Sequence, residues 1–155
     1  MGRWLTVLAM PMAVGVLSVA LVTADCGGAR AATCARGDFV SVVDEAASAL
    51  RDLNQSNKAT FQERLRALKA KNNWNQEEYL NAARPFVRDE KIASYDAQST
   101  KLLGEIAALG QEGSEAAKPD CEVLVQLRAR MEVLVKAQED KWSYMFAKID
   151  DALKP

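Results

Sequence analysis

The chain has 155 residues, 49% of them hydrophobic, with 20 lysine and arginine residues against 21 aspartate and glutamate residues. A chain of this size normally forms one domain with a substantial core, and its balanced charge excludes the strongly basic surface typical of nucleic-acid binding. The chain contains no histidine. It therefore lacks the usual general base near neutral pH and the commonest metal ligand, so we expect no metal site and no cofactor.

The first 31 residues have the layout of a secretory signal peptide. Arg3 provides a basic start, residues 4–22 are mostly apolar, and small residues follow. We predict a signal peptide at 1–31, a single domain over 32–155, and export to the periplasm or the medium. The apolar run is also long enough to span a bilayer, so the alternative is an uncleaved anchor on the outer face of the inner membrane. Membrane contact is expected only in that case.

Two positions satisfy the small-x-small rule for signal cleavage, one after Ala24 and one after Ala31. Cleavage after Ala31 removes Cys26 and leaves an even number of cysteines, Cys34 and Cys121, in a compartment where thiols oxidise in pairs. The number of cysteines therefore favours the second site. Lipid attachment at Cys26 is disfavoured, because the acidic residue before it fits a bacterial lipoprotein signal poorly.

Three long segments carry apolar residues at alternating steps of three and four, the pattern of a helix that buries one face. They span residues 38–71, 76–109 and 120–153, and polar turns at 72–75 and 111–119 separate them. Segments of similar length joined by short turns predict an all-α fold, an antiparallel up-down-up three-helix bundle.

Residues that favour helix ends mark the predicted boundaries. Asp38 is the expected N-cap of the first segment, and Asn75 with Glu78 forms a capping box for the second. Pro119 with Asp120 is expected to open the third. Gly110 is expected to close the second helix.

Two interruptions are expected inside the segments. The polar stretch 54–57 could break the first helix, but the apolar steps continue in phase through it, so we predict a single helix, in which a kink near Ser56 is one option. Pro85 lacks an amide donor and clashes with the preceding turn, which predicts a kink or short break near 82–84.

The cysteines provide an independent test of this topology. In an up-down-up bundle the first and third helices are parallel, so Cys34 and Cys121 lie at the same end and can approach within the roughly 6 Å that a disulfide requires. We therefore predict a Cys34–Cys121 disulfide, worth roughly 4 kcal/mol on the chain-entropy model.

No catalytic motif is present. Acidic residues occur as adjacent pairs, and neighbours on a helix point about 100° apart, so no single pair forms a two-carboxylate site. Patterns for zinc, di-iron, serine hydrolase and phosphate-binding sites are missing from the sequence. We therefore predict no catalytic residues.

Polar residues interrupt the apolar faces near the middle of the expected bundle. Asn57 and Gln138 are expected at nearly the same height, with Glu90 and Lys91 close to that level. One interpretation is a polar layer that fixes the register of the helices. The alternative is a small polar pocket in which Glu90 is an acid or a ligand anchor.

Aromatic residues gather toward the other end of the expected bundle. They are expected to fill the core there, and if they form an exposed patch they would suit a hydrophobic ligand or partner instead. The candidate ligand-binding residues are Trp74, Tyr79, Phe86, Glu90, Gln138, Trp142 and Phe146.

Together these features predict an exported, non-enzymatic protein that binds a protein partner in the cell envelope as an adaptor or in a chaperone-like way. One alternative is a carrier of a small hydrophobic ligand at the aromatic end. Another is a carboxylate-dependent hydrolase of envelope polymers with Glu90 as its acid.

Overall fold

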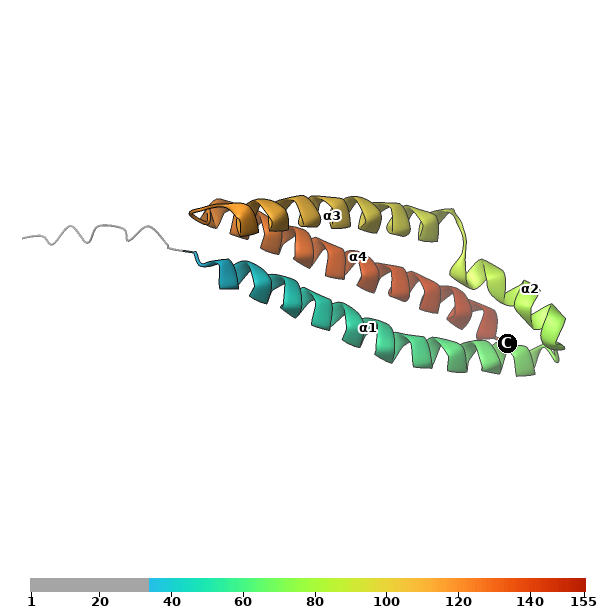
Figure 1. Cartoon of the computed structure of the whole chain (residues 1–155). Coiled ribbons are helices and arrows are strands. Elements are labelled where there is room, and N and C mark those ends of the chain that lie inside the picture. Colours follow the sequence, from blue (N-terminus) through green and yellow to red (C-terminus); the bar gives the residue numbers. More distant parts are fainter. Residues whose placement is uncertain (1–33) are drawn as a thin grey trace, which may run out of the picture. The chain divides into compact units, whose positions relative to one another are not determined.

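The computed structural model describes residues 34–155, and the regular structure in that range is helical. The helices are α1 (Arg36–Lys71), α2 (Gln76–Val87), α3 (Glu90–Glu115) and α4 (Cys121–Leu153) (Figure 1). The all-α fold class is therefore confirmed. The predicted signal peptide, its cleavage sites and Cys26 lie outside the described residues. Within 34–155, no helix has the length and apolar character needed to cross a membrane.

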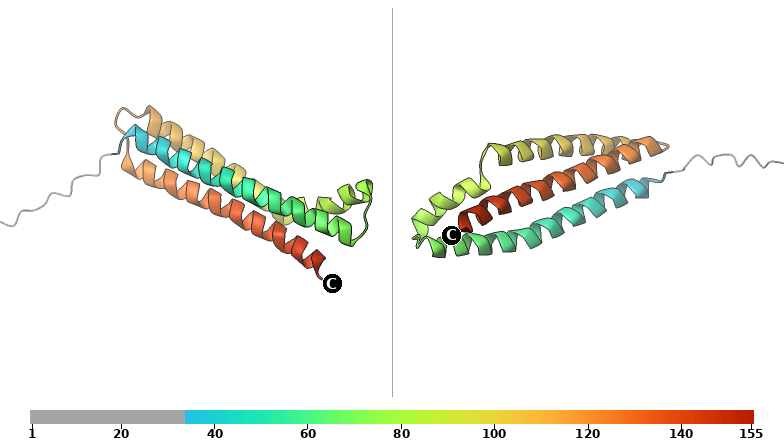
Figure 2. Two further views of the ribbon diagram at one scale, coloured as in Figure 1. Left: turned by 90° about the horizontal axis from the view of Figure 1, so that it is seen from below. Right: turned by 180° about the vertical axis from the view of Figure 1, so that it is seen from behind.

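Helix α4 is the common neighbour of the other helices. It lies beside α1 on one side and α3 on the other, whereas α1 and α3 touch much less (Figures 1 and 2). Helices α1 and α4 run in the same direction and α3 runs in the opposite one. The short helix α2 contacts the carboxyl-terminal part of α4.

Covalent and polar contacts join the helices at the amino-terminal end of α1. Cys34 and Cys121 form the predicted disulfide, with 5.4 Å between their Cα atoms and a sequence separation of 87. The Arg36 guanidinium donates a hydrogen bond to the Ala116 carbonyl at 3.1 Å, just past the end of α3. The beginnings of α1 and α4 and the end of α3 are thus held together.

The apolar side chains form two core clusters along the helices. The disulfide-proximal cluster contains Phe39, Val42, Ala46, Leu102, Ile106, Val123, Leu127, Met131 and Leu134. The distal cluster contains Phe61, Leu65, Ile92, Met145 and Ile149. Leu127 and Ile149 of α4 are completely buried, because α4 is packed against both neighbours.

Two predicted helix starts are confirmed. Asn75 accepts hydrogen bonds from the amides of Glu77 and Glu78, and its own amide donates to the Glu78 carboxylate at 2.8 Å. Asp120 accepts from the Glu122 amide at 2.9 Å. In both cases a side chain satisfies amides that the first helical turn leaves unpaired.

The predicted N-cap of the first helix was wrong by three residues. Helix α1 begins at Arg36 and its N-cap is Ala35. Asp38 instead lies in the first turn, where its carboxylate accepts a hydrogen bond from the Ala35 amide at 2.8 Å. An acidic residue at that position also interacts favourably with the positive end of the helix dipole.

Helix α1 continues through the polar stretch 54–57 without interruption. The Ser56 hydroxyl donates to the Asp52 carbonyl at 2.8 Å, and the Thr60 hydroxyl donates to the Ser56 carbonyl at 3.3 Å. These side chains bond to carbonyls one turn back, so they are accommodated within the helix. The helix bends gradually along its length in Figure 1.

The predicted break near 82–84 was wrong in position. Helix α2 passes through Pro85 to Val87, and the chain becomes extended at Arg88 and Asp89. The break occurs at Asp89, which caps the start of α3 and accepts hydrogen bonds from Tyr144 and Lys148 of α4. Tertiary contacts, rather than Pro85 alone, therefore place the break.

The predicted end of the second segment at Gly110 was also wrong. Helix α3 continues to Glu115, so the connection to α4 is 116–120 rather than 111–119. The second glycine in this region, Gly113, is buried beneath the ring of Phe39. Packing against α1 holds this last part of α3 in helical form despite its glycines.

Candidate binding groove

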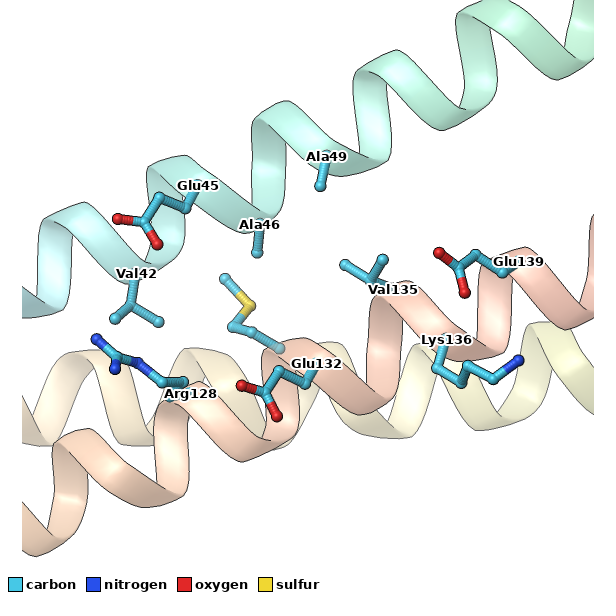
Figure 3. A pocket seen from close by; sticks show the side chains of 10 residues that line it. Val42, Glu45, Ala46, Ala49, Arg128, Glu132, Val135, Lys136 and Glu139 are labelled. Atoms are coloured by element: carbon cyan, nitrogen blue, oxygen red, sulfur yellow. The ribbon is translucent and has the colours of Figure 1, made fainter.

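A groove with a volume of about 700 Å³ runs between α1 and α4 and is open to solvent (Figure 3). Its size lies within the range of pockets that hold ligands or side chains of a partner. The residues that line it are Val42, Glu45, Ala46 and Ala49 of α1, and Arg128, Met131, Glu132, Val135, Lys136 and Glu139 of α4.

Small side chains on α1 create the groove. Ala46 and Ala49 point from α1 toward α4, where Val135 lies on the opposite wall (Figure 3). Met131 of α4 also lines the groove. An alanine side chain ends at its β-carbon, so it cannot fill the space that a leucine would occupy. The floor of the groove is therefore apolar; Ala46 and Met131 are buried in it, whereas Ala49 is exposed and Val135 is partly exposed.

Charged residues form the rim on α4. Lys136 makes an ion pair with Asp140, and the hydrogen bond from this lysine to the carboxylate raises the pKa of Lys136. Arg128, Glu132 and Glu139 make no ion pair with any other residue within 34–155. Most of the rim charge is thus available to an occupant of the groove.

The candidate ligand residues Trp142 and Phe146 are partly buried and pack against the distal cluster. Both rings pack edge-on against Phe61, with centroid distances of 5.8 Å. The Arg64 guanidinium covers the Phe146 ring at 4.6 Å and makes an ion pair with Asp150. Edge-to-face rings covered by a cation are typical of a packed aromatic core.

The remaining aromatic candidates are on or beside α2. Tyr79 and Phe86 are partly buried against the distal cluster, and the Lys69 ammonium lies 5.2 Å from the centre of the Tyr79 ring. Trp74 is half-buried in the turn between α1 and α2. Its amide donates to the Lys69 carbonyl at 3.1 Å and closes the end of α1.

Polar side chains join the helices between the two core clusters, but of the four residues expected in this layer only Gln138 takes part, and Asn54 rather than Asn57 contributes from α1. The Gln138 side-chain amide donates to the Ser99 hydroxyl at 2.6 Å, and the Trp142 indole donates to the Asn54 side-chain carbonyl at 3.1 Å. Ser99 is only 7% exposed, and its hydroxyl in turn donates to the Tyr95 carbonyl. The layer therefore contains contributions from α1, α3 and α4.

Glu90 and Lys91 lie away from this layer. Ser99, nine residues further along α3 than Glu90, is the residue level with Gln138. Glu90 is exposed in the first turn of α3, where a carboxylate stabilises the helix amino terminus. The Lys91 ammonium lies 4.4 Å from the centre of the Tyr144 ring. The predicted level of Glu90 and Lys91 along the bundle was wrong, because the prediction assumed three helical segments of equal length.

The junction of α2 and α3 is fixed to α4 by a polar cluster. One Asp89 oxygen accepts from the Ile92 amide at 2.8 Å, and the other accepts from the Tyr144 hydroxyl at 2.9 Å and from the Lys148 ammonium. Lys148 also donates to the Pro85 carbonyl. The hydrogen bond from Lys148 is the main cause that lowers the pKa of Asp89 to about 2, and the same carboxylate raises the pKa of Tyr144.

Sequence reasoning missed the groove, the junction and two members of the polar layer. Ser99 had one signal, because it is a polar residue at a stripe position flanked by apolar ones. The alanines of the groove had no such signal, because alanine is compatible with an apolar stripe whether or not side chains of the facing helix contact it. The junction depends on the register of α4 against α3, which no local pattern contains.

No family model, curated protein or solved structure matches this chain. Within the described residues, no group of three or more histidine, cysteine, aspartate or glutamate side chains is placed to hold a metal ion. The groove between α1 and α4 has a size and an apolar, charge-rimmed lining that suit a binding role.

Proposed function

We propose that this chain is an exported, non-enzymatic protein that binds a protein partner in the cell envelope through the groove between α1 and α4. The observation that carries the proposal is the groove itself, which combines an apolar floor with a charged rim where Arg128, Glu132 and Glu139 make no ion pair within residues 34–155. Protein interfaces commonly have an apolar centre surrounded by a polar rim.

Export is supported by two independent features. The first 31 residues have the layout of a signal peptide. The Cys34–Cys121 disulfide suits an oxidising compartment, because cytosolic thiols are normally kept reduced. On this proposal the protein is periplasmic or secreted, and the domain works as an up-down-up bundle of three legs that is closed covalently at one end.

A non-enzymatic role is supported by the placement of the acidic residues. Glu90, the candidate acid of the hydrolase alternative, is exposed at the start of α3. Asp89, its neighbour, is committed to capping α3 and binding Lys148. Neither carboxylate lies in the groove, so the groove gives no support to the hydrolase alternative with Glu90 as its acid.

Photo-crosslinking in the native host tests this proposal. A photoreactive amino acid replaces Ala49 in the groove, and Ala107, an exposed alanine of α3, is the matched control position. We expect protein adducts from position 49 after irradiation and none from position 107. Equal labelling from both positions, or none from position 49, would rule out the groove as a partner-binding surface.

Sequencing the amino terminus of the purified protein tests export. We expect the mature chain to begin at residue 32 and to contain no free thiol. A chain that keeps its first residues and fractionates with membranes would support the anchored alternative instead.

A further inference from the structure

The rim of the groove on α4 carries charges of alternating sign. Arg128, Glu132, Lys136 and Glu139 follow one another at steps of four, four and three residues, so they lie along one face of the helix. Figure 3 shows these side chains along the same side of α4.

Along α4 these charges are positive, negative, positive and negative. When the same helix runs in the opposite direction, each charge therefore meets one of opposite sign. If a second α4 is laid antiparallel along the first, Arg128 lies opposite Glu139 of the second copy, and Glu132 lies opposite Lys136 of the second copy. A parallel arrangement would place like charges together. Because complementary charges fix register and orientation at an interface, the pattern selects the antiparallel arrangement.

The apolar floor supplies a reason for two copies to associate. An antiparallel pair of α4 helices is related by a twofold axis, so the grooves of the two copies face each other. The apolar part of the groove that is still open to solvent, chiefly Ala49 and Val135 of each copy, then lies against the partner copy. Covering this floor removes apolar surface from water, which is the main driving force of association.

We propose that the occupant of the groove is a second copy of this chain, packed antiparallel across a twofold axis at the level between Glu132 and Val135. This inference rests on the proposed function, since it names the partner of the same groove. In the dimer, α1 and α4 of both copies surround one shared core of four helices.

Sedimentation velocity tests the dimer with the disulfide-intact protein, purified after expression with its own amino-terminal segment. We expect a concentration-dependent species of twice the chain mass. Arg128→Glu and Glu139→Arg should each weaken dimerisation at least about tenfold, because every substitution places like charges together twice in a symmetric dimer. The double variant Arg128→Glu/Glu139→Arg should restore the affinity to within about threefold of the original.

Arg51→Glu is the matched control, because Arg51 is an exposed arginine of α1 that does not line the groove. It should leave dimerisation unchanged. A chain that stays monomeric, or a dimer that the double variant does not restore, would refute the inference. The proposed function would survive a monomer if position 49 still crosslinks to a different envelope protein in the host, so the two failures are distinguishable.

Discussion

The ring of Phe39 in α1 packs directly onto Gly113 in α3. A β-carbon at position 113 would lie 2.2 Å from the Cε1 atom of that ring, which is closer than real atoms approach. Both residues are buried, and Phe39 belongs to the core cluster next to the disulfide. The two helices can meet at this point only because residue 113 has no side chain.

Gly113→Ala should therefore destabilise the protein. The added methyl group must displace the Phe39 ring from a packed core, and overpacking of this kind typically costs about 1–3 kcal/mol. Urea denaturation of the disulfide-intact protein measures the change in free energy of unfolding.

Gly110→Ala is the control, because nothing lies within 4 Å of the β-carbon position at residue 110 and that residue is also helical. It should be neutral or stabilising by up to about 1 kcal/mol, since alanine favours a helix more than glycine does. Equal effects of the two substitutions would show that Phe39 does not press on Gly113.

Loss of the disulfide should lower stability strongly. Cys34→Ser removes a link that closes a loop across a sequence separation of 87, and the chain-entropy model gives a loss of about 4 kcal/mol. Thermal unfolding without reductant measures the effect. Cys121→Ser and the double variant should match the single variant, because each loses the same bond, whereas an additive double variant would argue against a bond between these cysteines.

Local sequence patterns predicted the helix starts at which a side chain accepts hydrogen bonds from amides only two or three residues further along the chain. Asn75 and Asp120 are such cases, and both cap the helices that the sequence indicated. The interior apolar positions of α1 and α4 were also evident, because helical periodicity depends only on which face is buried.

The errors occurred where a distant residue decides the local structure. Pro85 did not end its helix at the expected place, since Asp89 and its partner Lys148 fix the break further along. Gly110 did not end α3, because α3 continues to pack against Phe39 through Gly113. The spacing between helices was not predictable either, and the groove depends on that spacing.

The contact between Ser99 and Gln138 should contribute measurable coupling between α3 and α4. Ser99→Ala and Gln138→Ala each remove the 2.6 Å hydrogen bond in a half-buried position. A double-mutant cycle, measured by urea denaturation, should give a coupling energy of about 0.5–1.5 kcal/mol.

Thr100 provides the control for this cycle, because it is the exposed neighbour of Ser99 and its hydroxyl bonds to the Asp96 carbonyl within α3. Thr100→Ala combined with Gln138→Ala should be additive within about 0.5 kcal/mol. If the Ser99 cycle is equally additive, the polar layer does not couple the two helices.

The Asp89 cluster should make stability depend on pH in the acidic range. The pKa of Asp89 is lowered from 3.8 to about 2, chiefly by the hydrogen bond from Lys148, so the folded state favours the charged carboxylate. A lowered pKa contributes stability that is present above about pH 4 and is lost as the pH falls through about 2.

Asp89→Asn keeps a side chain that can cap α3 but removes the charge. The variant should be less stable than the original protein at pH 6, and the difference should shrink toward pH 2. Urea denaturation across this range measures it, with Glu90→Gln, the exposed neighbouring carboxylate, as the control that should show a much smaller change. A stability difference for Asp89→Asn that is the same at pH 6 and pH 2 would mean that the charge of Asp89 does not hold the junction of α2 and α3 against α4.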